Sequence, residues 1–315
     1  MSHPRVVFLG TPDFAVPFLD ALTRSVYRPY LVITQPDEPV GRKKIPQPSP
    51  VKQAALSLQL PVHQPTTKRQ LQDVLRQAQP TVCILVAYGT IIPRATLSIP
   101  SFGFINAHPS LLPAYRGPSP VQQVLIDQQE NTGISLMVLD EQMDHGPVLV
   151  QESVTILPDD TNVTLHQRLA ARGAELLLEI LPQYLGGILA PRQQDHGMAT
   201  YTSIITRDNG LINWHLPARS IYAVFRAYTP WPGVFTYWRG KRLKITKLSF
   251  TDEVINPGSV TGRVIVSERG LLAVRCGVGQ VIVGRLQLEG KNDMSAQDFA
   301  RGYPEIIGSI LGSKD

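Results

Sequence analysis

The chain has 315 residues, of which 43% are hydrophobic and 17% charged, a composition that excludes disordered and fibrous proteins. Because single cores seldom extend beyond about 250–300 residues, this length predicts two domains. The net charge of +5 is uneven: residues 206–315 hold 15 Lys or Arg against 9 Asp or Glu, and the first 205 residues hold 15 against 16. A basic rear third fits either a polyanionic partner or a solubilising surface.

Strand and helix signals alternate along the front part of the chain. The predicted strands are 6–9, 30–34, 81–87, 102–107, 133–139 and, at an edge, 148–156; the predicted helices are 14–22, 69–77, 121–127 and 165–184. Strands that feed helices indicate right-handed crossovers, so we expect a Rossmann-like, mainly parallel sheet. Ligands of such sheets bind at the carboxyl ends of the strands.

The rear part of the chain has a different pattern. Residues 189–197 are polar and interrupted by Pro and Gly, which predicts a linker over 190–206 between domains at 1–189 and 207–315. Short β-type runs follow at 233–237, 243–248, 258–266, 271–275 and 280–288. Turn residues separate these runs, so the second domain is predicted to be a small OB-like β-barrel.

Membrane and metal signals are missing from the sequence. No apolar run approaches the roughly 18–20 residues that span a bilayer, and no leader pattern precedes the first strand, so we expect a cytoplasmic protein. Cys83 and Cys276 are far apart within apolar runs, which indicates buried free thiols. No Cys/His cluster has zinc spacing, and we expect no metal.

The most informative stretch is 104–117, an apolar strand that ends at a proline. Asn106 and His108 are two residues apart on this strand, so their side chains project to the same face. An amide donor and a titratable ring at the end of a strand suit an acyl-transfer centre. Either residue alone would more often be structural, but together they favour function.

An acidic loop follows the predicted strand 133–139. If that strand neighbours 102–107, Asp144 could reach His108, where a carboxylate would orient the ring and favour the imidazolium. The loop also contains Asp140 and Glu141, and the pattern alone does not choose among the three. A solvated acidic turn is the alternative interpretation.

Two other segments could line or border a ligand site. Residues 10–13 form a strand-to-helix turn without the G-x-G-x-x-G pattern of dinucleotide folds, and Pro12 removes an N–H that would face a pyrophosphate. Residues 40–50 form a long, proline-rich connection that contains Arg42, Lys43 and Lys44. Three adjacent cations fit phosphate contacts as well as they fit a solvated loop.

With these segments taken together, the sequence resembles the methionyl-tRNA formyltransferases over nearly its whole length. The resemblance rests on residues 8–15, 35–37 with 41–44, 87–89, 106–113, 227–233 and 288–291 with 294–295. The Asn-x-His and Leu-Leu-Pro core is shared with other folate-dependent formyltransferases. The basic loop and the Pro-Trp-Pro-Gly segment at 230–233 are similar to the member that acts on tRNA.

The resemblance implies an activity and roles for individual residues. The activity is transfer of the formyl group of 10-formyltetrahydrofolate to the amino group of methionine on initiator tRNA. The implied roles are catalytic for Asn106, His108 and Asp144, folate-contacting for Ser110, Leu111, Leu112, Pro113 and Ile92, and tRNA-binding for Arg42, Lys43 and Lys44. His145 departs from the pattern, because a small residue or Thr commonly follows the catalytic Asp.

Rival functions stay open at the level of sequence. A sibling enzyme could formylate a glycinamide nucleotide or an amino sugar, although the first would not need a basic second domain and the second usually has a further domain. A non-catalytic tRNA-binding protein is the rival from another class, and the intact Asn106, His108 and Asp144 argue against it. We expect a monomer.

Overall fold

The computed structural model describes residues 4–40, 45–253, 260–267 and 269–312. The chain separates into two compact units. The first comprises Met1–Pro120, Glu130–Ile156 and Thr164–Ser203, and the second comprises Val121–Gln129, Leu157–Val163 and Ile204–Asp315. Each unit is built around its own sheet.

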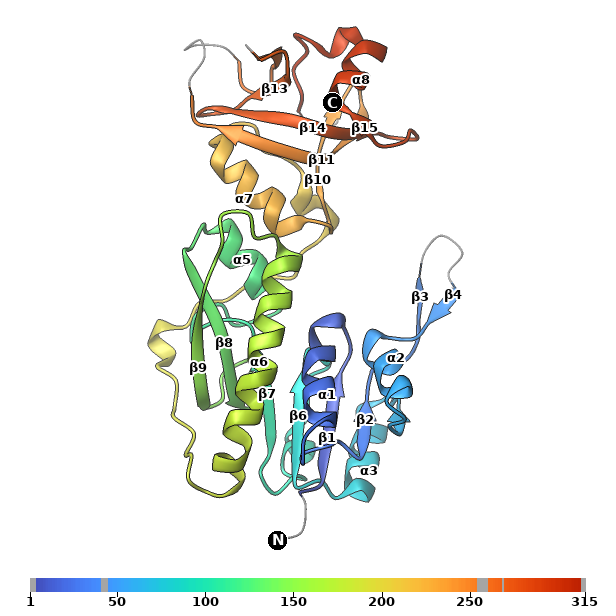
Figure 1. The fold of residues 1–315 in the computed structure, drawn as a ribbon, viewed down its shortest axis with the longest axis vertical. Coiled ribbons are helices and arrows are strands. Elements are labelled where there is room, and N and C mark those ends of the chain that lie inside the picture. Colours follow the sequence, from blue (N-terminus) through green and yellow to red (C-terminus); the bar gives the residue numbers. More distant parts are fainter. Residues whose placement is uncertain (1–3, 41–44, 254–259, 268, 313–315) are drawn as a thin grey trace. The chain divides into compact units, whose positions relative to one another are not determined.

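The sheet of the first unit has seven strands in the order β5-β2-β1-β6-β7-β8-β9 (Figure 1). The strands are β1 (Val6–Gly10), β2 (Leu31–Ile33), β5 (Val62–His63), β6 (Val82–Val86), β7 (Phe104–His108), β8 (Asn131–Val138) and β9 (Val148–Thr155), with a separate hairpin of β3 (Glu38–Val40) and β4 (Ile45–Gln47). The first five strands in this order pair in parallel, whereas β8 pairs antiparallel with both β7 and β9. The expected Rossmann-like, mainly parallel sheet is confirmed.

Helices cover both faces of this sheet (Figure 1). They are α1 (Val16–Thr23), α2 (Pro50–Ser57), α3 (Lys68–Ala78), α4 (Arg94–Leu97) and α6 (Asn162–Leu185), with α5 (Pro120–Ile126) mostly in the second unit. Val6 and Phe8 pack in one cluster with α1, α2 and α6, while Val7 and Leu9 pack in another with α3. Alternating side chains of each buried strand therefore supply two separate cores.

The helices of the first unit begin where the sequence supplies caps. The Ser49 hydroxyl accepts from the Lys52 N–H at the start of α2, and the Thr67 hydroxyl accepts from the Gln70 N–H at the start of α3. Pro50 occupies the first position of α2, where a missing N–H costs nothing. Sequence analysis did not identify α2 or the β3–β4 hairpin.

β7 presents its polar residues to the face covered by α3. Phe104 belongs to the core cluster on that face, whereas Ile105 and Ala107 pack on the opposite one. Asn106 and His108 alternate with Ile105 and Ala107, so they share the face of Phe104. Two polar side chains thus stand together at the carboxyl end of a central strand.

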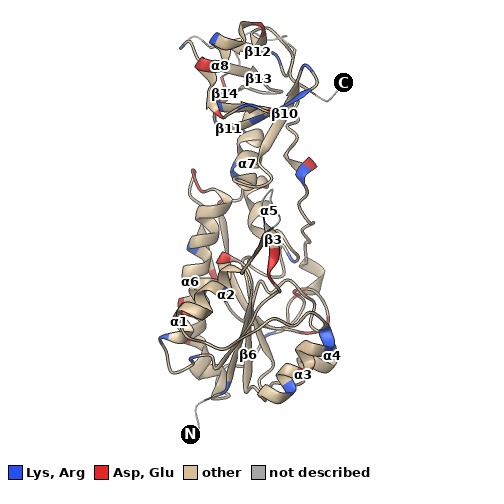
Figure 2. Ribbon diagram, turned by 90° about the vertical axis from the view of Figure 1, so that its right-hand side faces the viewer, with Lys and Arg blue, Asp and Glu red and all other residues tan. Residues whose placement is uncertain are grey.

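The second unit contains a six-stranded antiparallel sheet in the order β10-β11-β14-β13-β12, with β15 paired to β14. The strands are β10 (Val234–Trp238), β11 (Lys241–Thr251), β12 (Val264–Val266), β13 (Leu272–Arg275), β14 (Gln280–Leu288) and β15 (Met294–Ser295), accompanied by α7 (Ala218–Tyr228) and α8 (Ala296–Gly302). This antiparallel sheet fits the predicted small β domain, although the two helices were not predicted. Four of the basic residues of this unit lie on the single strand β11: Lys241, Arg242, Lys244 and Lys247 (Figure 2).

The two cysteines and the length and character of the helices bear on two further expectations from the sequence. Cys83 and Cys276 are both buried and unpaired, as predicted, and burial raises the pKa of the Cys276 thiol to about 11. Within the described ranges, no helix combines the length and the apolar character that crossing a bilayer requires.

Candidate active site

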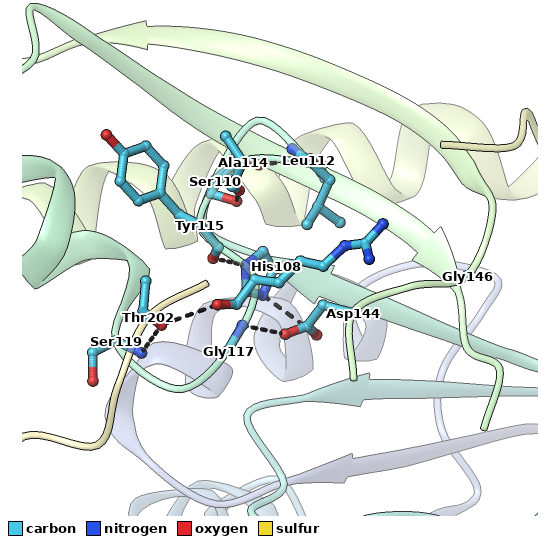
Figure 3. Close-up of polar contacts among 12 residues, drawn as sticks. His108, Ser110, Leu112, Ala114, Tyr115, Gly117, Ser119, Asp144, Gly146 and Thr202 are labelled. Carbon is cyan, nitrogen blue, oxygen red and sulfur yellow. Dashed lines mark hydrogen bonds and ion pairs between the residues drawn. The ribbon is translucent and has the colours of Figure 1, made fainter. Parts of the chain in front are cut away.

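His108 is the central side chain of the site and is only 5% exposed. Its Nε2 lies 2.9 Å from the Tyr115 carbonyl oxygen, and its Nδ1 lies 3.6 Å from Asp144 Oδ1 (Figure 3). Both ring nitrogens therefore face oxygen acceptors, and only the imidazolium offers a donor to each of them. Nε2 must donate to the carbonyl, which fixes the orientation of the ring.

The three acidic side chains of the loop after β8 have three different partners. Asp140 lies 2.5 Å from His145 Nδ1, Glu141 lies 3.1 Å from Arg94 Nε, and Asp144 faces His108. The Asp144 Oδ2 also accepts a hydrogen bond of 2.8 Å from the Gly117 N–H (Figure 3). Of the three carboxylates that the sequence left open, Asp144 is the one beside His108.

The path of this loop differs from the one assumed from sequence. β8 does neighbour β7, but the pairing is antiparallel, with Ile105 opposite Val138. The loop consequently starts beside Phe104, whose carbonyl accepts from the Leu139 N–H at 2.9 Å, rather than at the end of β7 that carries His108. It then folds back and brings Asp144 to the imidazole.

Asn106 supplies a second polar group on the same face of β7. Its side chain is 6% exposed, and no described residue forms a hydrogen bond with its amide. A buried amide without a protein partner is costly unless a ligand or water completes its hydrogen bonds. Its N–H is therefore available to an oxygen that approaches His108.

The described part of the chain contains no cluster of His, Cys, Asp and Glu suited to a metal ion.

The segment 110–113, which the resemblance assigns to folate contacts, is fixed by buried polar groups of neighbouring strands. The Ser135 hydroxyl donates to the Ser110 carbonyl at 2.6 Å and accepts from the Leu112 N–H at 3.1 Å. The Gln151 amide donates to the Leu112 carbonyl at 2.8 Å. Sequence analysis missed Ser135 and Gln151; a polar residue within the buried β8, opposite His108 in register, was the available signal.

Ile92, the other residue matched to folate contacts, is 5% exposed and packs in the core on the α3 face. Leu112 packs in a small cluster with Met137 and Val148, and Leu139 contacts both clusters. Leu111 and Pro113 are half-buried beside them. Apolar side chains from these two segments are thus brought to the same region of the unit.

The carbonyl of Tyr88 joins three of the segments that carried the resemblance. It accepts from the Thr11 hydroxyl at 3.0 Å and from the Gln35 amide at 3.1 Å. The Gln35 amide also donates to the Thr90 hydroxyl at 2.8 Å. Burial raises the pKa of the Tyr88 phenol to about 12, so this ring stays neutral at physiological pH. These bonds fix the loop that leads to Ile92.

Arg42, Lys43 and Lys44, predicted to contact tRNA, lie outside the described residues. β3 and β4, which precede and follow them in the sequence, pair with each other in register from Glu38–Gln47 to Val40–Ile45.

Gly146 tests whether the shape of the Asp144 loop matters. A Cβ at this position would lie 1.9 Å from the Val138 carbonyl oxygen, so Gly146→Ala must displace the main chain two residues from Asp144. We expect kcat to fall about 10-fold and unfolding free energy to drop by about 1–3 kcal/mol, as in other overpacked sites. Steady-state kinetics and thermal unfolding measure the two effects.

Gly302→Ala is the matched control. A Cβ at Gly302 meets nothing within 4 Å and the residue lies in α8, so activity should be unchanged and stability equal or slightly higher. A Gly146→Ala protein with the kcat of the unmodified chain would mean that the loop tolerates the shift.

Comparison with known proteins places this chain in a family. Residues 4–181 match the family model described as formyl transferase, and residues 204–304 match the formyl transferase C-terminal domain. A methionyl-tRNA formyltransferase from Roseiflexus castenholzii is 43% identical over 311 residues, covering 98% of this chain and 99% of the relative. That of Myxococcus xanthus is 42% identical over 311 residues, covering 98% of each.

Solved structures share the fold at low sequence identity. An N-formyltransferase from Helicobacter canadensis in complex with folinic acid and dTDP-3-aminofucose superposes with a TM-score of 0.66 at 19% identity, covering 89% of this chain and 98% of that one. HypX from Aquifex aeolicus in complex with tetrahydrofolic acid gives 0.64 at 14% identity, covering 97% of this chain and 48% of that one.

The Rossmann-like sheet within residues 4–181 and the matched C-terminal domain after it make the chain a formyl transferase. Within that class, the sequence identity above 40% over nearly the full length distinguishes the family. The chain belongs to the methionyl-tRNA formyltransferase family.

Proposed function

We propose that this chain transfers the formyl group of 10-formyltetrahydrofolate to the α-amino group of methionyl-initiator tRNA, giving N-formylmethionyl-tRNA for translation initiation. The observation that carries the proposal is the 42–43% identity to methionyl-tRNA formyltransferases over both domains. Solved structures of the same fold contain folinic acid or tetrahydrofolic acid, which supports a folate co-substrate. In this proposal the chain acts as a cytoplasmic monomer, with catalysis in residues 1–189 and tRNA contacts divided between residues 207–315 and the segment with Arg42, Lys43 and Lys44.

The proposed reaction begins when the methionyl amine attacks the formyl carbon and negative charge develops on the formyl oxygen. The Asn106 amide would donate to this oxygen, and the positive charge of a protonated His108, whose two N–H groups face the Tyr115 carbonyl and Asp144, would stabilise it electrostatically without reorganisation. Asp144 would balance the charge of His108 and, through water, accept the proton that the amine loses. Collapse of the intermediate breaks the bond to N10 of the folate, which takes up a proton as tetrahydrofolate leaves.

The folate would lie against the apolar side chains that the structure brings together near this centre. Ile92 and Leu112 offer buried apolar surface, and Leu139 contacts the clusters of both. Ser110, Leu111 and Pro113 complete the set that we propose to contact the co-substrate. Ser135 and Gln151 would act indirectly, because their hydrogen bonds fix Ser110 and Leu112.

Arg42, Lys43 and Lys44 are proposed to neutralise phosphates near the acceptor end of the tRNA. Each phosphate contact contributes about 0.7–0.9 to the slope of log affinity against log salt. Replacing all three residues with glutamine should therefore lower that slope by about 2 and weaken tRNA binding at low salt. Filter binding or fluorescence titration at several salt concentrations measures the slope.

Three other cations of the same domain provide the control. Lys68, Arg69 and Arg76 are exposed on α3, and changing them together to glutamine alters the net charge by the same amount. The slope should then stay within about 0.5 of that of the unmodified protein, on the scale set by one phosphate contact. If both triple variants have the same slope, the Arg42–Lys44 segment has no special part in tRNA binding.

The activity itself is tested with competing amines. The purified chain is incubated with 10-formyltetrahydrofolate and, separately, methionyl-initiator tRNA, glycinamide ribonucleotide or a nucleotide-linked amino sugar. We expect N-formylation of the methionyl-tRNA alone. Formylation of a small-molecule amine instead would support a sibling formyltransferase, and tRNA binding without formylation would support a non-catalytic tRNA-binding protein.

A further inference from the structure

Arg116 is the largest side chain that is fully buried, with 1% of its surface exposed. Its guanidinium donates to Gln194 Oε1 at 2.7 Å from Nη2 and 3.3 Å from Nε, to His196 Nδ1 at 2.9 Å, and to the Tyr201 hydroxyl at 3.2 Å. All three partners belong to the segment 192–202, and no carboxylate in the described ranges forms an ion pair with Arg116. A buried cation held by neutral groups costs desolvation energy, so its position calls for an explanation beyond stability.

The segment 192–202 lies along the first unit and belongs to it. Backbone hydrogen bonds attach it at both ends: Arg192 pairs with Val148, and Arg116 pairs with Thr200 and Thr202. The Thr202 hydroxyl also bonds the Arg116 carbonyl (Figure 3). The segment thereby contacts the strand that follows the Asp144 loop and the stretch that follows His108.

Gln194 connects Arg116 to the Asp144 loop. Its side-chain oxygen accepts from Arg116, so the amide nitrogen points the other way and donates to the carbonyls of Asp144 at 2.9 Å and Gly146 at 2.7 Å. Donors on one side and acceptors on the other permit only this orientation of the amide. Gln194 is 8% exposed, so water does not readily replace these bonds.

The main chain of Asp144 needs such support. Its φ of +50° lies in the left-handed region, which Asp tolerates better than most residues with a Cβ but which is stabilised by contacts with the surroundings. Gln194 holds the carbonyl of Asp144, and the Gly117 N–H, directly after Arg116, holds its carboxylate. The main-chain carbonyl of Asp144 is thus held by a residue bonded to Arg116, and its carboxylate by the residue that follows Arg116.

A second contact joins the segment 192–202 to this loop. The ring of His196 stacks on that of His145, with centroids 3.8 Å apart and planes 7° apart. Because His196 Nδ1 accepts from the Arg116 guanidinium, the proton of this ring is on Nε2. His145, the residue that departs from what the resemblance implies, thus stacks on His196 while its side chain stays 24% exposed.

From these contacts we propose that Gln194, oriented by Arg116, is a positioning residue for Asp144. The segment 192–202 then completes the active site, instead of serving only as a connection between domains. The inference rests on the proposed function, because its readout is formyl transfer. The alternative is that backbone pairing alone holds the segment 192–202 and that the Gln194 side chain only fills space.

Gln194→Glu separates these two interpretations. A glutamate keeps the shape and strengthens the pair with Arg116, but its second oxygen faces two carbonyl oxygens instead of donating to them. We expect kcat to fall about 10-fold, since losing two modest hydrogen bonds at the loop is equivalent to about one decade in rate. The KM for methionyl-tRNA should stay within about twofold, and the ion pair gained with Arg116 should offset the stability lost with the two hydrogen bonds, so that the variant stays folded at the assay temperature.

Gln193→Glu is the matched control, because Gln193 is the exposed neighbour and acquires the same charge. Its kcat should equal that of the unmodified chain. Should Gln194→Glu fold poorly, Gln194→Met keeps the length of the side chain, removes the same hydrogen bonds and enters the same measurements. Equal kcat in the Gln194 and Gln193 variants would overturn the positioning role.

A double-mutant cycle shows whether Gln194 acts through Asp144. In an Asp144→Asn background, Gln194→Glu should lower kcat by less than about twofold, because the group that it positions has already lost its charge. A further 10-fold loss would mean that Gln194 acts through something else and would contradict the inference. Absence of formyl transfer by the unmodified chain would instead refute the proposed function.

Discussion

His108→Ala is expected to lower kcat for formyl transfer by about 10²–10³, the usual cost of removing one preorganised group that stabilises an oxyanion. The imidazole is 5% exposed and faces both Asp144 and the Tyr115 carbonyl, and a water molecule in its place would not carry the positive charge of the ring. Affinity for tRNA should change little, because the phosphate contacts lie elsewhere in the proposal. Single-turnover formylation at saturating folate measures the chemical step.

His63→Ala is the control for this prediction. His63 is an exposed residue of β5 at the opposite edge of the sheet from β9, and its removal should leave single-turnover rates within about twofold, as for surface substitutions in general. A His108→Ala protein that reacts as fast as His63→Ala would remove His108 from the mechanism.

The fold was largely predictable because its signals are local. The apolar runs at Val6–Gly10 and Val82–Val86 are typical of buried strands, and turn residues separate the short strands of the second unit. Strand direction is not local. β8 follows the short α5 and is almost continuously buried, and nothing in its pattern distinguishes an antiparallel strand beside β7 from a parallel one.

The candidate site was predictable in part for the same reason. Asn106 and His108 share a strand, so a period of two places them on one face. Choosing among the acidic residues of the loop required tertiary partners: His145 pairs with Asp140 and Arg94 with Glu141. The Gln194 contact joins residues 50 positions apart, and no spacing rule connects such positions.

Arg116 is the clearest case of a residue that sequence analysis could not interpret. It stands within the informative stretch 104–117, just beyond the residues that carry the resemblance, and a charged residue there suggests a substrate contact as readily as a structural one. Its burial and its three neutral partners became apparent only with the segment 192–202 in place. That segment had been predicted as a linker because its composition is polar and rich in turn residues.

Asp144→Asn is expected to lower kcat by about 10²–10³, within the range that general acid–base groups contribute. The change is nearly isosteric, and the amide oxygen can still accept from the Gly117 N–H that now bonds Oδ2, so the loop should keep its shape and the protein its melting temperature. What disappears is the negative charge 3.6 Å from His108 Nδ1, and with it the group that balances an imidazolium and accepts a proton through water.

Glu141→Gln is the control, because it removes a charge from the same loop. The Glu141 side chain is 54% exposed beside Arg94, and exposed ion pairs contribute little, so kcat should stay within about twofold. Equal losses in the two variants would indicate that the net charge of the loop matters rather than the pairing of Asp144 with His108. An unchanged rate in Asp144→Asn would leave His108 to act without a carboxylate partner, contrary to the proposed mechanism.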